Sequence, residues 1–192
     1  MGLSVAAPVA ALGRRSAAYI ADSLVIGLAY IALGVMFDSI FGPLVAATPD
    51  GLSLMVVAVN PLRVALELSA TLVVDALYFA GCWCRWGATP AQRALGLRVR
   101  LQGSAASAAE SAASARGLPA EAAGRRWALL AILPIALGSL SASGAMDVSL
   151  VAVVNGAWFL ILLVSASVDP LRRGLHDRVA GTIVVSVSRR PA

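Results

Sequence analysis

Three carboxylic acids lie inside long apolar stretches of the sequence, where an ionisable side chain is costly. Asp22 is in the first stretch, and Glu67 and Asp75 are in the second. A charged residue at the centre of a lipid bilayer costs roughly 2.5 to 3.5 kcal/mol, so such residues are usually paired or functional. Carboxylates in a low-dielectric bundle can bind a cation or exchange a proton, because neighbouring like charges favour the protonated form of one of them.

Helical spacing indicates which of these groups can meet. Arg15 and Asp22 are seven residues apart, which places them on nearly the same helix face, with Arg14 on an adjacent face. At 1.5 Å per residue, Asp22 and Asp75 lie about 10 and about 15 Å from the basic ends of their stretches. We therefore predict that both aspartates and an arginine share the bundle interior. A structural clamp between arginine and aspartate, which only fixes helix packing, is the alternative.

A polar stripe runs along the second apolar stretch. Glu67, Thr71 and Asp75 are spaced four residues apart, so a helix places them on one face, with Glu67 nearer the outer end. Lipid excludes such a stripe, and another helix or water must cover it.

Four apolar stretches must position these residues. The chain is 59% hydrophobic and only 13% charged, whereas soluble domains carry about a quarter charged residues. About 20 apolar residues span a hydrocarbon core of about 30 Å. The third stretch is short and contains Pro134, so it crosses only if the glycine and serine residues after it continue the helix. We predict an all-α transmembrane helical bundle of one domain, 1–192, with an uncleaved first span and about four spans at 17–37, 64–83, 127–143 and 148–168.

The charges of the connecting segments predict the topology. Arginines before the first span, between the second and third, and after the fourth greatly outnumber Arg63 on the other side, where Asp38, Asp50 and Asp147 lie. Because cytoplasmic loops carry the excess of basic residues, we predict that both termini are cytoplasmic. Arginine and alanine are abundant and lysine is absent, which favours a bacterial source and the cytoplasmic (inner) membrane. Few aromatic residues accompany the arginines, so we expect no nucleic-acid partner.

The long segment between the second and third spans has two different halves. Residues 103–124 are rich in alanine, serine and glycine, which predicts a flexible linker. Residues 97–101 and 182–188 alternate or are rich in β-branched side chains, which is typical of short strands. Both lie on the predicted cytoplasmic side, so they could pair into a small β-ribbon at the membrane surface.

Metal and enzyme chemistry find little support in the sequence. Cys82, Cys84 and the single histidine, His176, do not make the four-ligand set of a structural zinc site, so we expect neither a metal nor another cofactor. His176 and Asp177 have no nucleophile or metal partner at a fixed spacing, so we expect no enzyme. We predict instead a structural or gating role, in which the tail docks against the segment 89–98. The residues of this predicted role are Thr89, Pro90, Arg93, His176, Asp177 and Arg178.

The arrangement of an arginine before the first span, an aspartate within it and an aspartate within the second resembles the RDD family of bacterial membrane proteins. The sequence departs from the family pattern at Ala91, where glycine is usual, and at Gln92, where lysine is common, although we expect the turn to form. The resemblance implies a membrane protein with suggestions of transport or ion exchange. The similar segments are Arg14 to Asp22, Asp75 to Phe79, Gly87 to Pro90 with Arg93, Leu95 to Val99, Arg172 to Arg178, and Ala180 to Thr182.

Two functions from different classes remain open at this point. The first is transport of an ion or small solute through the bundle, with Asp22, Asp75, Glu67 and Arg14 or Arg15 as candidate site residues. Four short spans make a slim pathway, so transport predicts a homo-oligomer in the lipid bilayer. The second is a non-catalytic scaffold or assembly factor, in which the buried charges specify helix pairing and the basic surface recruits a partner or lipid.

Overall fold

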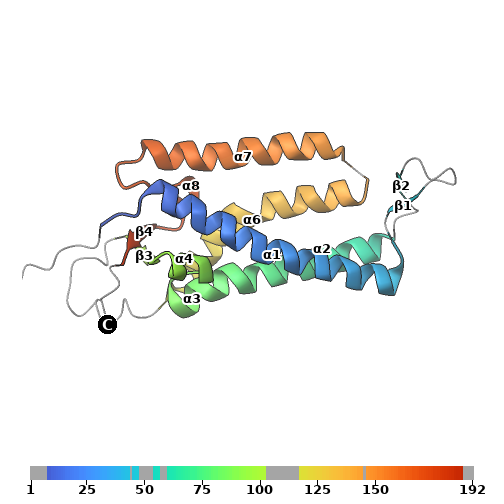
Figure 1. The fold of residues 1–192 in the computed structure, drawn as a ribbon, viewed down its shortest axis with the longest axis horizontal. Coiled ribbons are helices and arrows are strands. Elements are labelled where there is room, and N and C mark those ends of the chain that lie inside the picture. The colour runs from blue at the N-terminus through green and yellow to red at the C-terminus, as the bar shows by residue number, and fades with distance from the viewer. Residues whose placement is uncertain are drawn as a thin grey trace, which may run out of the picture.

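The computed structural model describes residues 8–43, 45–47, 54–56, 60–102, 117–144 and 146–187. Within these ranges four helices are long and apolar enough to cross a membrane, which confirms the predicted fold class. Figure 1 shows them running along a common direction, with small elements gathered at both ends. The four spans are α1 (Leu12–Phe41), the helix Pro61–Trp86, α6 (Ala120–Ala142) and α7 (Val148–Val168).

The second span is one helix with a wider turn inside it. It consists of α2 (Pro61–Ala76), the π-helical segment η1 (Leu77–Gly81) and α3 (Cys82–Trp86). Asn60 caps its start by accepting a hydrogen bond from the amide of Leu62 at 2.9 Å. The π turn begins two residues after Asp75, and such turns are frequent at functional sites.

The third span is a helix of 23 residues, long enough at 1.5 Å per residue for a core of about 30 Å. It continues through Pro134 and the glycine and serine residues that follow, as the four-span prediction required. The helix also begins inside the segment 103–124, which the sequence predicted as a linker. Leu118 and Ala123 are buried there, and this apolar contact holds residues 117–124 against the second span. The remainder, 103–116, lies outside the described residues.

Much of the helical surface is apolar and exposed. On α1, Leu24, Leu28, Ile31 and Val35 follow one another at helical spacing and are 64% to 69% exposed. Exposure of such an apolar stripe to water is unfavourable, whereas contact with lipid tails is not. The long helices therefore have the surface of a lipid-embedded protein.

Two small antiparallel sheets mark the two ends of the bundle (Figure 1). At one end, β3 (Leu97–Leu101) pairs with β4 (Thr182–Ser186), which confirms the predicted ribbon. The chain before α1 extends this sheet, since the amide of Ala10 donates to the carbonyl of Val184 at 3.0 Å. At the other end, β1 (Val45–Ala47) pairs with β2 (Leu54–Val56). We call these the ribbon end and the hairpin end.

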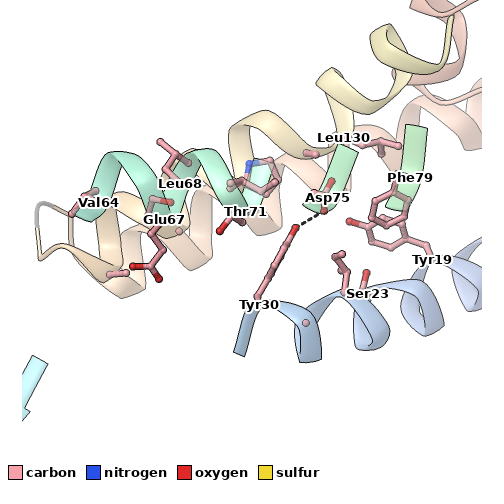
Figure 2. A pocket seen from close by; sticks show the side chains of 18 residues that line it. Tyr19, Ser23, Tyr30, Val64, Glu67, Leu68, Thr71, Asp75, Phe79 and Leu130 are labelled. Atoms are coloured by element: carbon pink, nitrogen blue, oxygen red, sulfur yellow. Dashed lines mark hydrogen bonds between the residues drawn. The ribbon is translucent and has the colours of Figure 1, made fainter. Parts of the chain in front are cut away.

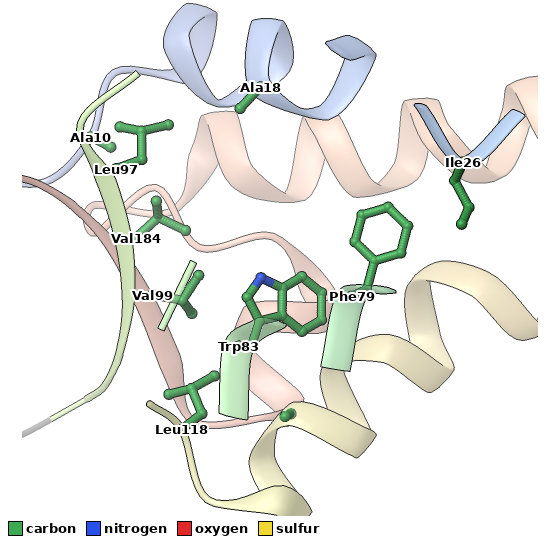
Figure 3. Packing of buried hydrophobic residues seen from close by; sticks show 10 residues of the cluster. Ala10, Ala18, Ile26, Phe79, Trp83, Leu97, Val99, Leu118 and Val184 are labelled. Carbon is green, nitrogen blue, oxygen red and sulfur yellow. The ribbon is translucent and has the colours of Figure 1, made fainter. Parts of the chain in front are cut away.

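A buried core lies at the ribbon end around Trp83, which is 1% exposed (Figure 3). The indole ring contacts Phe79 with 5.8 Å between ring centroids. The carbonyl oxygen of Trp83 accepts hydrogen bonds from the amides of Gly87 at 2.9 Å and Leu118 at 2.8 Å. Trp83 therefore accepts the bond that closes the last turn of the second span, and it holds the segment that leads into the third span.

A substitution at Gly117 tests how closely this segment packs against the end of the second span. A Cβ atom on Gly117 would lie 1.9 Å from the carbonyl oxygen of Cys84, so Gly117→Ala must push the two backbones apart. We expect a loss of about 1 to 3 kcal/mol in the free energy of unfolding, as in overpacked cores. Thermal unfolding of the purified protein, followed by tryptophan fluorescence, measures it. The matched control is Gly124→Ala, because a Cβ there meets no atom within 4 Å. Equal midpoints for the two variants would contradict the assigned packing.

Candidate functional site

Asp22 is held by the turn between the second span and β3. Its side chain is 1% exposed, and its two oxygens accept hydrogen bonds from Tyr78 Oη at 2.7 Å and Thr89 Oγ1 at 2.5 Å. The backbone amide of Ala91 donates to it as well, at 3.2 Å. Asp22 therefore joins α1 to the second span and to α4 (Pro90–Ala94) through neutral donors.

The turn forms despite the two departures from the family pattern. Thr89 caps α4, and Pro90 occupies its first turn, where no amide donor is needed. The Gln92 side-chain oxygen accepts from the amide of Thr89 at 3.0 Å and from Trp83 Nε1 at 3.1 Å. Arg93 lies over the ring of Trp86, 5.3 Å from its centroid. Gln92 thus ties the turn to the core.

Asp177 is the most highly connected charge at the ribbon end. It lies in the short helix α8 (Leu175–Val179), is fully buried, and forms ion pairs with both Arg15 and Arg126. Thr182 Oγ1 lies 3.2 Å from the carboxylate, and the amide of Gly174 donates at 3.2 Å. We call Arg15, Arg126 and Asp177 the arginine clamp.

Sequence reasoning counted Arg126 only as a basic loop residue, whereas it is buried in the arginine clamp. It also lies over the ring of Trp83, 4.8 Å from the centroid, a cation–π contact. A signal for it existed in the sequence. Arg125 and Arg126 stand before the third apolar stretch as Arg14 and Arg15 stand before the first, and in both pairs the second arginine turns inward.

Arg15 and Asp22 do line one cavity, but in the described part of the chain neither Arg14 nor Arg15 is paired with an intramembrane aspartate. Arg14 donates to the carbonyl oxygen of Leu95, and Arg15 pairs with Asp177. Neither arginine forms an ion pair with Asp22 or Asp75, all of which belong to the described part of the chain. The reason is that arginine side chains so near a span's end reach the tail and the turn, which the helical spacing alone does not reveal.

Asp75 lies deeper in the bundle and has different partners. It is 4% exposed and accepts a hydrogen bond from Tyr30 Oη (Figure 2). It accepts a second one from Trp127 Nε1 at 2.7 Å. Within the described ranges no arginine or histidine forms an ion pair with it. Sequence reasoning missed Tyr30 and Trp127, since an aromatic residue in an apolar stretch gives no sign of a polar contact.

Glu67 is paired at the hairpin end. Arg63, which is buried, lies 3.6 Å from the partly exposed carboxylate of Glu67 and forms a second ion pair with Asp38. Arg63 was the one arginine on the predicted outer side, and these two acids account for it. The polar stripe therefore contains one compensated carboxylate, Glu67, and one that has only neutral donors, Asp75.

A cavity of about 410 Å³ lies between α1, α2 and α6. Glu67, Thr71 and Asp75 line it, so the stripe predicted from the sequence does face an interior space (Figure 2). A second cavity of about 250 Å³ lies nearer the ribbon end. Its walls carry Arg15, Asp22, Arg126 and His176. The two cavities share three lining residues, Tyr19, Phe79 and Leu130.

His176 is buried beside the arginine clamp, and Arg178 of the same helix is exposed. Burial lowers the pKa of His176 well below its usual value, and the charges of Arg126 and Arg15 lower it further. The imidazole is therefore neutral at pH 7. Cys82 and Cys84 are free thiols, and among the described residues no group of three or more acidic, cysteine or histidine side chains gathers around a common point.

The arginine clamp predicts a large effect of Asp177→Asn on stability. Loss of the charge leaves two arginines without their carboxylate in a buried site, which typically costs about 3 to 5 kcal/mol. Thermal or denaturant unfolding in detergent measures the change. Glu121→Gln is the matched control, since its pair with Arg125 is exposed and such pairs contribute about 0 to 1 kcal/mol. Similar losses in both variants would refute a special role for the clamp.

His176 predicts a pH dependence of stability. Its folded-state pKa is lowered, so its contribution is complete above the unfolded pKa of about 6.5 and decreases as the pH falls below that value. We expect a loss of about 2 kcal/mol between about pH 7.5 and about pH 5, much of it absent in His176→Gln. Hydrogen bonds from Arg173 lower the pKa of Asp169 to about 2, so protonation of Asp169 changes stability only below this pH range. Identical pH profiles for the native protein and the variant would exclude the effect.

Comparison with known proteins assigns the chain to a family. The sequence model of the RDD family matches residues 9–181, which is most of the chain. No curated protein and no solved structure matches it. The matched range contains Arg15, Asp22 and Asp75 on their spans and the tail that carries Asp177. The chain therefore belongs to the RDD family, as a membrane protein with four candidate spans.

Proposed function

We propose that this protein transports a proton or a small cation across the bilayer, with Asp75 as the binding carboxylate. The observation that carries the proposal is that Asp75 lines the larger cavity and that its hydrogen-bond donors within the described ranges, Tyr30 and Trp127, are neutral. A buried carboxylate without a cationic partner lowers its free energy by taking up a proton or a cation. Asp75 is thus equipped to bind and release positive charge.

The two cavities support a pathway along the bundle. They lie one after the other between the hairpin end and the ribbon end. Both are lined by Tyr19, Phe79 and Leu130. On this proposal the two rings and the leucine would form a narrow partition between the cavities. Rotation of these side chains would join the two spaces, and closing them again would separate the two sides of the membrane.

We further propose that the ribbon end lies in the cytoplasm of a bacterial cell, with both termini there. The arginine-rich segments at the ribbon end and the acidic loops at the hairpin end support this orientation. The protein would act without enzymatic turnover and as a homo-oligomer in the inner membrane. The exposed apolar face of α1, with Leu24, Leu28 and Ile31, supports this by offering a surface to another copy in the bilayer.

A scaffold or assembly role is the second candidate, and a specific observation favours it. Three of the acids have partners within the chain. Asp22 accepts hydrogen bonds from neutral donors, and Asp177 and Glu67 are paired with arginines. Such closed networks specify helix pairing and need no transported ion. On this proposal Asp75 is one more packing contact, and its neutralisation should damage folding before anything else.

Ion flux in proteoliposomes tests the transport proposal. Asp75→Asn keeps the shape of the side chain and an acceptor for Tyr30, but removes the charge. We expect proton or cation flux to fall at least about tenfold, since each 1.4 kcal/mol of lost binding energy is a factor of ten. Asp147→Asn is the matched control, because Asp147 caps α7 at the hairpin end and asparagine is an equally good cap.

Three outcomes separate the two candidates. Flux lost in a folded, monodisperse Asp75→Asn protein and retained in Asp147→Asn supports transport. Flux in the native protein that Asp75→Asn leaves unchanged removes Asp75 from the pathway. No flux in the native protein, with Asp75→Asn failing to fold, favours the scaffold.

A further inference from the structure

We propose that the larger cavity binds an amphipathic organic monocation, with Asp75 as its counter-ion. The site stands on the geometry of the cavity, and only its role as a transport substrate rests on the proposed function. The proposal follows from the size of the cavity, the chemistry of its wall and the balance of charge around it.

The volume exceeds what a proton or a bare metal cation needs. The cavity measures about 410 Å³, whereas one water occupies about 30 Å³. Sites for organic ligands occupy roughly 300 to 1,000 Å³, are mostly apolar, and hold a few fixed polar groups. Small residues create the room, since a Cβ atom added at Gly27 or Gly138 would meet no other atom within 4 Å.

The wall near Asp75 is aromatic. Figure 2 shows Tyr30 and Tyr19 of α1 and Phe79 of η1 around the Asp75 carboxylate. An aromatic face attracts a cation through its quadrupole, and the attraction grows when water is excluded. Rings and a carboxylate together suit a cation that carries apolar groups.

The charges around the cavity select for a cation. Among the residues that the structure describes, no arginine or histidine lines it, and the two acids in its wall are Glu67 and Asp75. Arg63 lies just outside, 3.6 Å from Glu67, and is shared with the exposed Asp38. Of the two acids in the cavity wall, Asp75 is therefore the one with no arginine beside it, which suits a monocation as its counter-ion.

Equilibrium binding of tetraphenylphosphonium to the full-length protein in lipid nanodiscs tests the proposal, with empty nanodiscs as the blank. We expect saturable binding that weakens on acidification, because protons compete for the same carboxylate. Asp75→Asn should weaken it at least about tenfold. The neutral analogue triphenylphosphine oxide should bind far more weakly than the cation.

A second variant fills the space and leaves Asp75 intact. Gly27→Leu places a side chain in the cavity and should also weaken binding at least about tenfold, as expected for a blocked apolar site. Gly13→Leu, the same change in the same helix but outside both cavities, should bind like the native protein. This pair separates loss of the site from a general effect of the substitution.

Each possible result supports or overturns a specific part of the proposal. No saturable binding in the native protein, equal binding of the neutral analogue, or unchanged binding in folded Asp75→Asn would overturn the proposal. If Asp75-dependent flux of protons or small cations is present without tetraphenylphosphonium binding, only the organic substrate class fails. If the organic cation binds through Asp75 but no flux occurs, the transport proposal fails and the binding site stands.

Discussion

A charged side chain that is buried away from water needs a compensating partner, and this chain meets that requirement most fully at Asp177. Its carboxylate receives Arg15 from α1 and Arg126 from α6, and lies beside Thr182 of β4. These partners bring the first span, the third span and the tail to one point. An isolated arginine there would be costly, so each of these segments is held in place by the charge balance of the others.

The polar contacts at the ribbon end combine with apolar packing. Trp83 lies under Arg126, contacts Phe79, and donates to Gln92, which in turn braces the turn that holds Asp22. The ribbon, the turn and three of the spans are thus fixed together. The larger cavity lies outside this framework, where glycines and a π turn reduce close packing. Rigid support next to an open interior is the arrangement that a binding site requires.

The sequence predicted the spans and the ribbon because each depends on a local pattern. Apolar length defines a membrane helix, and alternation defines the strands of β3 and β4. The charge partners could not be predicted in the same way. Helical spacing gives the face of Arg15 but not the element opposite, and its partner Asp177 is 162 residues away. Tyr30 and Trp127 were missed because only tertiary structure turns an aromatic residue of an apolar span toward Asp75.

Asp22 and Asp75 look alike in sequence, yet their hydrogen bonds set them apart. A carboxylate has about four acceptor positions. Asp22 uses three of them, from Tyr78, Thr89 and Ala91, and these donors come from elements that it holds together. Asp75 accepts one bond on each oxygen, which leaves about two positions, and the larger cavity lies beside it. Because a cation needs both unused acceptor positions and space, Asp75 is the better ligand of the two, and Asp22 is the better structural residue.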